Sequence, residues 1–394
     1  MNTQDEVVVK EVYLDYNGSA PLDPRVADAM TPVLLEGVGN ASSSHRFGRY
    51  QTAVVDRARE QVAALVGGRA ADVVFTAGAT EANNLALRGA VEAAHGDRRR
   101  ILVSAVEHAS VHKVSRSLSE QGLAKLDVIP VSSGGFVDLE EMEELIDDDV
   151  LLVSVMAANS ETGVLNPVDE IAERVHAAGA LFHCDATQMV GRLPFDLQRV
   201  GADLVSISSH KICGPGGVGA LIGTRQSLRL IQPIIHGGGQ ERGLRSGSLN
   251  VAGIVGLGAA ADTAADERAA EASRVVKLRD RLVADIKAKI PDVHENGDTI
   301  RRLPNTASIR FEGTDAEAVV TQMDPVAVST GSACSSGSID PSAVLLAMGL
   351  SRDAAFETVR FSLGRFTTGS DIEAAAASAV TAVQYVRSMT RETF

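Results

Sequence analysis

Apolar runs of strand length alternate with segments of helix length through the first part of the chain. The runs that we interpret as buried strands are Val73–Phe75, Ile101–Ala105, Asp127–Val131, Val150–Ala157, Leu181–Asp185, Leu204–Ser208 and Val218–Ile222. The candidate helices between them are Thr80–Ala94, Ser110–Gln121, Leu139–Ile146 and Val168–Ala178. This alternation predicts an α/β fold with a mainly parallel central sheet and helices on both faces. Ligands of such sheets gather at the carboxyl ends of the strands.

The pattern changes near residue 260. Ala259–Ile290 is rich in Ala, Glu, Arg and Lys and predicts one long helix. The strands expected after it are Ala307–Phe311, Val326–Ser329 and Thr358–Ser362, and the expected helices are Ala316–Met323, Ser342–Met348 and Asp371–Met389. The chain of 394 residues is too long for one compact core. We therefore expect a large domain over residues 21–259 and a smaller α+β domain over residues 260–394.

The composition is ordinary for a globular protein, whereas the charge is strongly acidic. Apolar residues make up 45% of the chain and charged residues 22%. The formal net charge of −14 disfavours direct binding of nucleic acid, because the phosphate backbone is also negative. No apolar run approaches the roughly 20 residues that cross a bilayer, and Met1–Lys10 lacks the apolar region of a signal peptide. We expect a cytoplasmic protein without a membrane partner.

The first stretch with chemical content is Ser206–Lys211, where a strand ends in hydroxyl residues, His210 and Lys211 before a glycine turn. A lysine enclosed at a strand end loses its proton more easily, and a neutral amine forms an imine with an aldehyde. A surface lysine in a loop is the alternative. Gly214–Gly219 also matches a dinucleotide-binding fingerprint, but that fingerprint needs a helix where we expect the strand Val218–Ile222. We therefore reject a dinucleotide site.

Three further strand ends carry polar residues. Asp185 closes a strand, and a carboxylate there could hold a pyridinium nitrogen protonated or simply cap a turn. Gly78 and Thr80 lie where a strand meets a helix, which suits a phosphate or a plain helix cap. His108 could stack on an aromatic cofactor and transfer protons. Its spacing to His112 is too weak a motif for a metal site, and we expect no metal.

Cysteine usage excludes a disulfide framework and draws attention to one thiol. The cysteines are Cys184, Cys213 and Cys334, too few for a stapled domain. Cys334 lies within Ser329–Ser338, where nearly every residue is small or polar, so the segment should be mobile. We interpret Cys334 as a nucleophile on a flexible tether, with an incidental surface thiol as the alternative.

Taken together, the motifs resemble the cysteine desulfurases of the NifS/IscS-like group, within the class V aminotransferase family. The resemblance rests on ordered motifs from Tyr13 to Phe366, which are Tyr13–Tyr16, Ser44–Gly48, Gly78–Glu81, Asn159–Gly163, Asp185–Gln188, Ser209–Lys211, His236–Arg242, Gly331–Cys334 and Arg360–Phe366. It implies fold type I of the pyridoxal 5′-phosphate (PLP) enzymes, the aspartate-aminotransferase-like fold. Residues 1–20 would then join the small domain.

The resemblance also implies a role at each matching position. Lys211 would be the Schiff-base lysine, Cys334 the sulfur acceptor, and His108 the third catalytic residue. The residues that would bind PLP are Lys211, Asp185, Gln188, Gly78, Ala79, Thr80, His108, Asn159, Ser208, His210 and Ser248. The residues that would bind the substrate L-cysteine are Arg360, Asn159 and Asn40. The products would be L-alanine and a persulfide on Cys334, passed on to sulfur-acceptor proteins.

Several positions depart from the family pattern. Ser248 replaces a threonine that usually reaches the partner subunit's cofactor, and its hydroxyl still permits a homodimer with a shared site. Cys213 replaces a tyrosine, and Gly18-Ser19-Ala20 replaces Ala-Thr-Thr. Alternative functions are a selenocysteine lyase, another class V aminotransferase or lyase, and a thiol hydrolase that uses Cys334. Iron–sulfur cluster assembly, tRNA thiolation, thiocofactor synthesis and DNA phosphorothioation all stay open as destinations of the sulfur.

Overall fold

The computed structural model describes residues 11–96, 98–331 and 340–391. Its largest sheet has seven strands in the order β2-β8-β7-β6-β5-β3-β4. Their bounds are β2 Val73–Thr76, β3 Arg100–Ser104, β4 Lys125–Ile129, β5 Val150–Ser154, β6 Leu181–Asp185, β7 Leu204–Ser208 and β8 Gly219–Gly223. In this sheet β8 runs antiparallel to β2 and β7, and the other six strands all run in one direction. The predicted α/β class with a mainly parallel sheet is confirmed.

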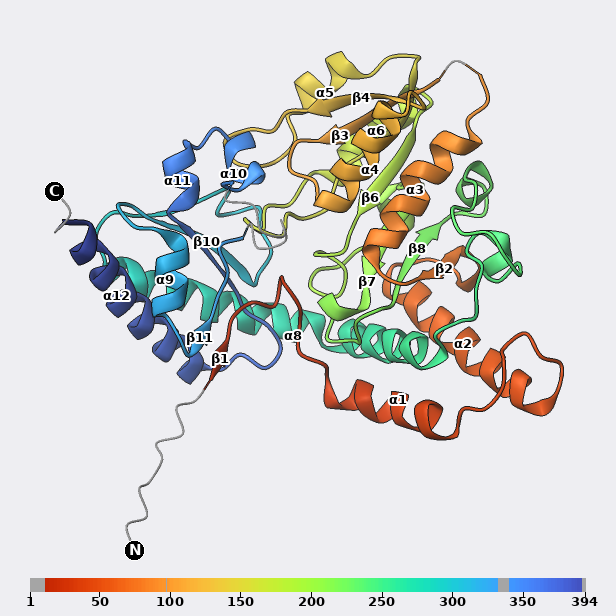
Figure 1. The fold of residues 1–394 in the computed structure, drawn as a ribbon, viewed down its shortest axis with the longest axis horizontal. Coiled ribbons are helices and arrows are strands. Elements are labelled where there is room, and N and C mark those ends of the chain that lie inside the picture. Colours follow the sequence, from red (N-terminus) through yellow and green to blue (C-terminus); the bar gives the residue numbers. More distant parts are fainter. Residues whose placement is uncertain (1–10, 97, 332–339, 392–394) are drawn as a thin grey trace, which may run out of the picture.

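Two helical layers cover this sheet because successive residues of each strand face opposite sides. On one face, Val74 of β2 packs with the helices α3 (Ala79–Ala93) and α4 (Ala109–Glu120). On the other face, Val73 and Phe75 pack with a second group of helices (Figure 1). The helices that contribute to that group are α1 Pro24–Glu36, α2 Arg46–Leu65, α5 Leu139–Leu145, α6 Val168–Ala177, α7 Leu197–Val200 and the first part of α8 Val251–Lys289.

A separate hydrophobic core lies at the other end of α8, which runs along both parts of the molecule (Figure 1). It is built on a three-stranded antiparallel sheet in the order β12-β10-β9 and a two-stranded sheet of β1 and β11. The elements around this core are β1 Val12–Tyr13, β9 Val293–Glu295, β10 Thr306–Phe311, α9 Ala316–Gln322, β11 Val326–Ala327, β12 Thr358–Ser362 and α12 Gly369–Arg391. The short helices α10 Ala343–Ala347 and α11 Arg352–Phe356 pack instead in a small cluster with Val106. We propose that the two cores correspond to the two domains, with the N-terminal strand β1 joined to the smaller one.

The structure differs from the expectation at several elements. The long helix begins at Val251 rather than Ala259, and β5 ends at Ser154 rather than Ala157. The helices α1 and α2 were missed altogether. The strand over Gly219–Gly223 is present where the dinucleotide fingerprint would have required a helix. None of the helices in the described ranges is long and apolar enough to cross a membrane.

Candidate active site

A cavity of about 660 Å³ opens at the carboxyl ends of the parallel strands. This volume lies within the roughly 300–1,000 Å³ of small-molecule sites. Ten of the predicted site residues line it, namely Gly78, Ala79, Thr80, His108, Asp185, Gln188, Ser208, His210, Lys211 and Arg360. They come from five separate stretches of chain. The strand order of the large sheet brings four of these stretches to one edge, and Arg360 joins them from β12 of the three-stranded sheet.

One end of the cavity is formed by the N-terminus of α3, where Gly78 caps the helix with a φ of 151°. The first N–H groups of a helix have no partner within it and attract anions. A side chain on Gly219 of the adjacent β8 would lie 2.7 Å from the Cα of Gly78, so both glycines allow the close approach. Ser208 Oγ and His210 Nδ1 lie 3.2 Å apart beside this turn. Burial lowers the pKa of His210 to about 4, and the charges of Lys211 and Arg192 act in the same direction.

Lys211 extends into the same cavity from the short turn that follows β7. Its Nζ donates hydrogen bonds of 2.5 Å to the carbonyl oxygens of Asn17 and Gly18. The Asn17 carbonyl also accepts from Gln188 Nε2 at 3.0 Å. The side chain of Gln188 is also fixed by Arg192, which donates to its Oε1 at 2.8 Å. The loop after β1 therefore supplies the acceptors for two predicted cofactor-binding groups.

Asp185 is buried at the end of β6 with both carboxylate oxygens engaged. Oδ1 accepts from the backbone N–H of Thr187 at 3.0 Å, and Oδ2 accepts from Asn83 Nδ2 at 2.8 Å. Two titratable neighbours are also buried. Burial raises the pKa of Glu107 to about 8 and lowers the pKa of His183. Both are therefore largely uncharged near neutral pH, so neither is a charged partner for Asp185.

His108 caps the N-terminus of α4, because its Nδ1 accepts from the backbone N–H of Ser110 at 3.1 Å. Arg360 reaches the cavity from β12 in the other core. Its guanidinium donates to Asp15 Oδ1 at 2.6 Å and to the carbonyl of Ser160 at 3.2 Å. A substrate carboxylate at Arg360 would therefore meet a guanidinium that already has one acidic partner.

Four predicted residues do not line the cavity. Asn159 is buried nearby, but its amide is bonded to Val106, Glu161 and Thr162. Asn40 and Ser248 are exposed on loops away from the lining. Cys334 lies outside the described residues. The roles assigned to these four therefore stay predictions.

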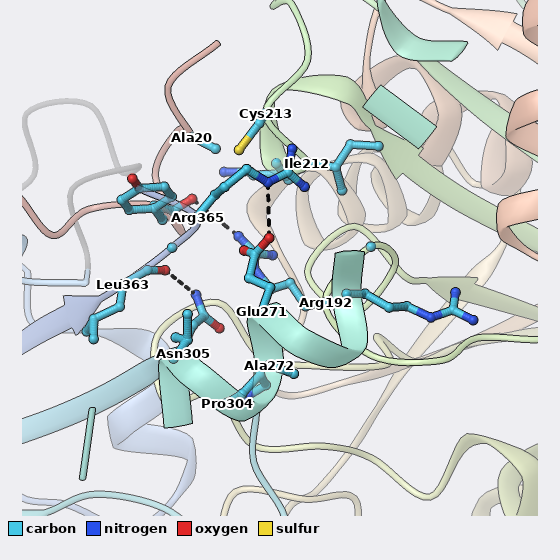
Figure 2. Close-up of a pocket in the computed structure, with 16 residues that line it drawn as sticks. Ala20, Arg192, Ile212, Cys213, Glu271, Ala272, Pro304, Asn305, Leu363 and Arg365 are labelled. Carbon is cyan, nitrogen blue, oxygen red and sulfur yellow. Dashed lines mark hydrogen bonds and ion pairs between the residues drawn. The ribbon is translucent and has the colours of Figure 1, made fainter. Parts of the chain in front are cut away.

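A second, smaller cavity of about 30 Å³ lies behind Lys211, against α8. Figure 2 shows Cys213 at its wall beside Ala20, with Arg365 and Glu271 paired across it. Cys213 is buried, has a φ of 62°, and burial raises its pKa to about 11. A thiol with so high a pKa is a poor nucleophile, so Cys213 fills space in this wall.

The chain matches the family model described as aminotransferase class V over residues 12–375. It belongs to the class V aminotransferase family. It is 44% identical to a protein of Anaeromyxobacter sp. (strain Fw109-5) named cysteine desulfurase IscS, over 96% of this chain and 94% of the relative. Family, fold type and the PLP dependence that the family implies agree with the expectation from the motifs.

Two solved structures resemble this member of the family closely. One, of a NifS-like protein, has a TM-score of 0.89 at 34% identity and covers 95% of this chain and 100% of that one. Another, titled "SspA in complex with cysteine", has a TM-score of 0.80 at 29% identity and covers 91% of this chain and 100% of that one. Both likenesses extend over nearly the whole molecule.

The residues of the large cavity fit PLP. A phosphate requires N–H and hydroxyl donors, and the α3 N-terminus, Thr80 and Ser208 offer them. A pyridinium nitrogen requires a fixed carboxylate, and Asp185 is held by two hydrogen bonds. An aldehyde requires an amine in the same cavity, and Lys211 provides it. The cavity therefore holds a partner for the phosphate, the ring nitrogen and the aldehyde of PLP.

Three residues near these groups were missed by the sequence reasoning. Asn17 supplies a carbonyl to Lys211 and Gln188, Asp15 pairs with Arg360, and Asn83 holds Asp185. Asp15 was part of a quoted motif, which could have drawn attention to it. Asn17 acts through its backbone and Asn83 lies inside a helix, so the pattern of residue types contains no signal for either.

Proposed function

We propose that this protein is a PLP-dependent cysteine desulfurase, which converts L-cysteine to L-alanine and transfers the sulfur to Cys334. The main support is the cavity that brings Lys211, Asp185 and the α3 N-terminus together. Similarity over nearly the whole chain to a protein named cysteine desulfurase supports the choice of substrate, as does the likeness to a structure solved with cysteine.

When bound, PLP supplies an electron-accepting ring that loosens bonds at the α- and β-carbons of an amino acid. Lys211 would hold it through its amine, and Asp185 would face the ring nitrogen. Gly78, Ala79, Thr80, Ser208 and His210 would hold the phosphate, Gln188 the ring oxygen, and His108 one face of the ring.

Lys211 would also move protons at the substrate's α-carbon. The carbonyls of Asn17 and Gly18 offer its ammonium a resting position. Arg360 would bind the substrate carboxylate, a task that suits a guanidinium fork. The thiolate of Cys334 would then attack the substrate sulfur. The carbon–sulfur bond breaks, a sulfur–sulfur bond forms, and one cysteine plus one thiol gives one alanine plus one persulfide.

The finer assignments belong to the same proposal. We propose a homodimer in which Ser248 of one subunit reaches the phosphate of the other, because Ser248 is exposed and does not line its own subunit's cavity. Asn40 and Asn159 would contact the substrate. Sulfur-acceptor proteins would receive the persulfide, with no direct nucleic acid or membrane partner. We propose a cytoplasmic location, because the thiol of Cys334 must stay free between turnovers and a reducing compartment keeps thiols free.

The proposal is tested by two variants and one matched control. Cys334→Ala should bind PLP and change its absorbance on addition of cysteine, yet form no alanine. Lys211→Ala should lose the visible absorbance band of the lysine-bound cofactor. Cys213→Ser should keep that band and most alanine formation, because Cys213 lines the smaller cavity. Normal alanine formation by Cys334→Ala would refute the role of Cys334.

The same assay separates the alternatives. A selenocysteine lyase would release alanine from selenocysteine and not from cysteine. Another class V aminotransferase would form a keto acid without needing a thiol. A thiol hydrolase would be active in colourless protein that does not respond to added PLP.

A further inference from the structure

The amide of Asn83 connects two residues that face the cofactor site. Asn83 lies in the second turn of α3 and is fully buried. Its Nδ2 donates to Asp185 Oδ2 at 2.8 Å and to Ser110 Oγ at 2.8 Å. Ser110 Oγ in turn lies 2.8 Å from His108 Nδ1. One amide nitrogen thus joins the end of β6 to the start of α4 through its two N–H groups.

The direction of each hydrogen bond between Asn83, Ser110 and His108 follows from which groups can donate. The backbone N–H of Ser110 can only donate, so His108 Nδ1, which accepts it at 3.1 Å, carries no proton. Ser110 Oγ accepts from Asn83, and its own hydroxyl proton is then directed to the same Nδ1. His108 is therefore a neutral imidazole with its proton on Nε2.

On the other side, Asn83 fixes the carboxylate of Asp185. Oδ2 accepts from Asn83 and Oδ1 from the backbone of Thr187, so the carboxylate plane is set by bonds from two different elements. A carboxylate held by donors at both oxygens remains an acceptor. That is the state needed to pair with a protonated ring nitrogen.

The other titratable groups near these hydrogen bonds do not take over the role of Asn83. Glu107 accepts its hydrogen bonds from Ser104 and the backbone of Met156. His183 is bonded to Ser154 and Ser206 on the neighbouring strands. Since burial keeps both largely uncharged near neutral pH, neither provides a charged partner for Asp185.

We infer that Asn83 is a positioning residue, whose single amide presents Asp185 to the ring nitrogen as an acceptor and, through Ser110, presents His108 with its proton on Nε2. The inference rests on the proposed binding of PLP in this cavity. The hydrogen bonds of Asn83 have two arms, one to Asp185 and one through Ser110 to His108. Asn83 takes part in both arms, whereas the hydroxyl of Ser110 takes part only in the His108 arm, and this difference can be measured.

The test compares Asn83→Leu, Ser110→Ala and a matched control, Asn296→Leu. Asn296 is also buried and donates from Nδ2 to two hydroxyls, those of Ser308 and Thr358, but it lies in the other core. The His108 arm is read by nitrogen NMR of histidine-labelled protein, with His108→Gln to assign the signal. The Asp185 arm is read by titrating PLP into each protein and following the visible absorbance band.

In the parent protein, we expect His108 to show an unprotonated Nδ1 and a protonated Nε2. Ser110→Ala removes the hydroxyl that donates to Nδ1 of His108, and Asn83→Leu removes the amide that orients this hydroxyl. Both variants should therefore move the Nδ1 signal downfield. PLP affinity should fall about tenfold in Asn83→Leu, the effect of one lost bond to a charged group, and by less than about threefold in Ser110→Ala. Asn296→Leu should change neither reading.

A proton on Nδ1 of His108 in the parent protein would overturn the inference. The inference would also be overturned if Asn83→Leu had the same His108 Nδ1 signal and the same PLP affinity as the parent protein or as the control variant. If Asn83→Leu does not fold, Asn83→Asp serves instead, because a carboxyl group has at most one proton to donate and must lose at least one arm. Retention of both parent readings by Asn83→Asp would equally refute it. Failure of the parent to bind PLP would instead count against the proposed function, since the NMR reading does not need the cofactor.

Discussion

Replacing Glu107 by glutamine tests how strongly the fold forces a proton onto this side chain. Glu107 follows β3 and is buried, and its Oε1 accepts from Ser104 Oγ at 2.5 Å and from the Met156 N–H at 2.7 Å. Its Oε2 is buried without a hydrogen-bond partner among the described residues. Burial, with a smaller contribution from the charge of Asp185, raises its pKa from 4.5 to about 8.

The sign and size of the effect follow from this difference in pKa. In the unfolded chain Glu107 loses its proton near pH 4.5, whereas the folded protein keeps it to about pH 8. The folded state therefore binds the extra proton between these values, and stability falls as pH rises through that window. At about 1.4 kcal/mol for each pKa unit, the wild type should lose roughly 4 kcal/mol relative to Glu107→Gln between pH 5 and pH 9. Glutamine mimics the protonated acid and can keep both bonds at Oε1.

Urea denaturation at pH 5, 7 and 9, with saturating PLP, measures this difference. Both proteins should be similar at pH 5, and Glu107→Gln should unfold at clearly higher urea concentration at pH 9. Glu144→Gln is the matched control, because Glu144 is exposed on α5 and its replacement removes the same charge. A constant difference between wild type and Glu107→Gln over the three pH values would refute the reasoning.

Three further variants test the site and its supports. Arg360→Lys should raise the KM for cysteine by about tenfold or more, because a point charge cannot replace the two-pronged fork, and steady-state alanine formation measures this. Gly219→Ala should lower the thermal midpoint and weaken PLP binding, since its Cβ would lie 2.7 Å from the Cα of Gly78; an unchanged midpoint would contradict the close approach. Glu241→Ala should destabilise the protein by about 3–5 kcal/mol in urea, because it leaves Arg59 without its bidentate partner, whose two bonds are 2.7 Å each.

The strands of the large sheet and the functional residues at their ends could be predicted from the sequence. A β-branched apolar run that stops at Asp185 or at Ser208 marks both a buried strand and its carboxyl end. Since parallel strands end at the same edge, residues distant in sequence were expected to meet there. The structure brings nine of them to one cavity, and Arg360 of β12 joins them there.

The two helices at the start of the chain, α1 and α2, and the first part of α8 depend on tertiary packing and were not predicted from the sequence. Glycines weaken a helix prediction, and Gly253, Gly256 and Gly258 all lie in the segment of α8 that was missed. In the fold, a side chain on Gly258 would lie 2.7 Å from the Cα of Ala58 in α2. The glycines thus allow α2 and α8 to touch, a gain that only the packed pair reveals.

The sequence by itself determined the fold class, the family and the identity of the chemical groups, because these depend on local pattern and on residue type. Only the tertiary structure decided how those groups are held. Asn83 meets Asp185 across 102 positions of the chain, Asp15 meets Arg360 across 345, and Glu107 becomes buried in a protein interior. Hydrogen bonds and desolvation depend on distances in space, and a linear pattern contains no information about contacts between such distant residues.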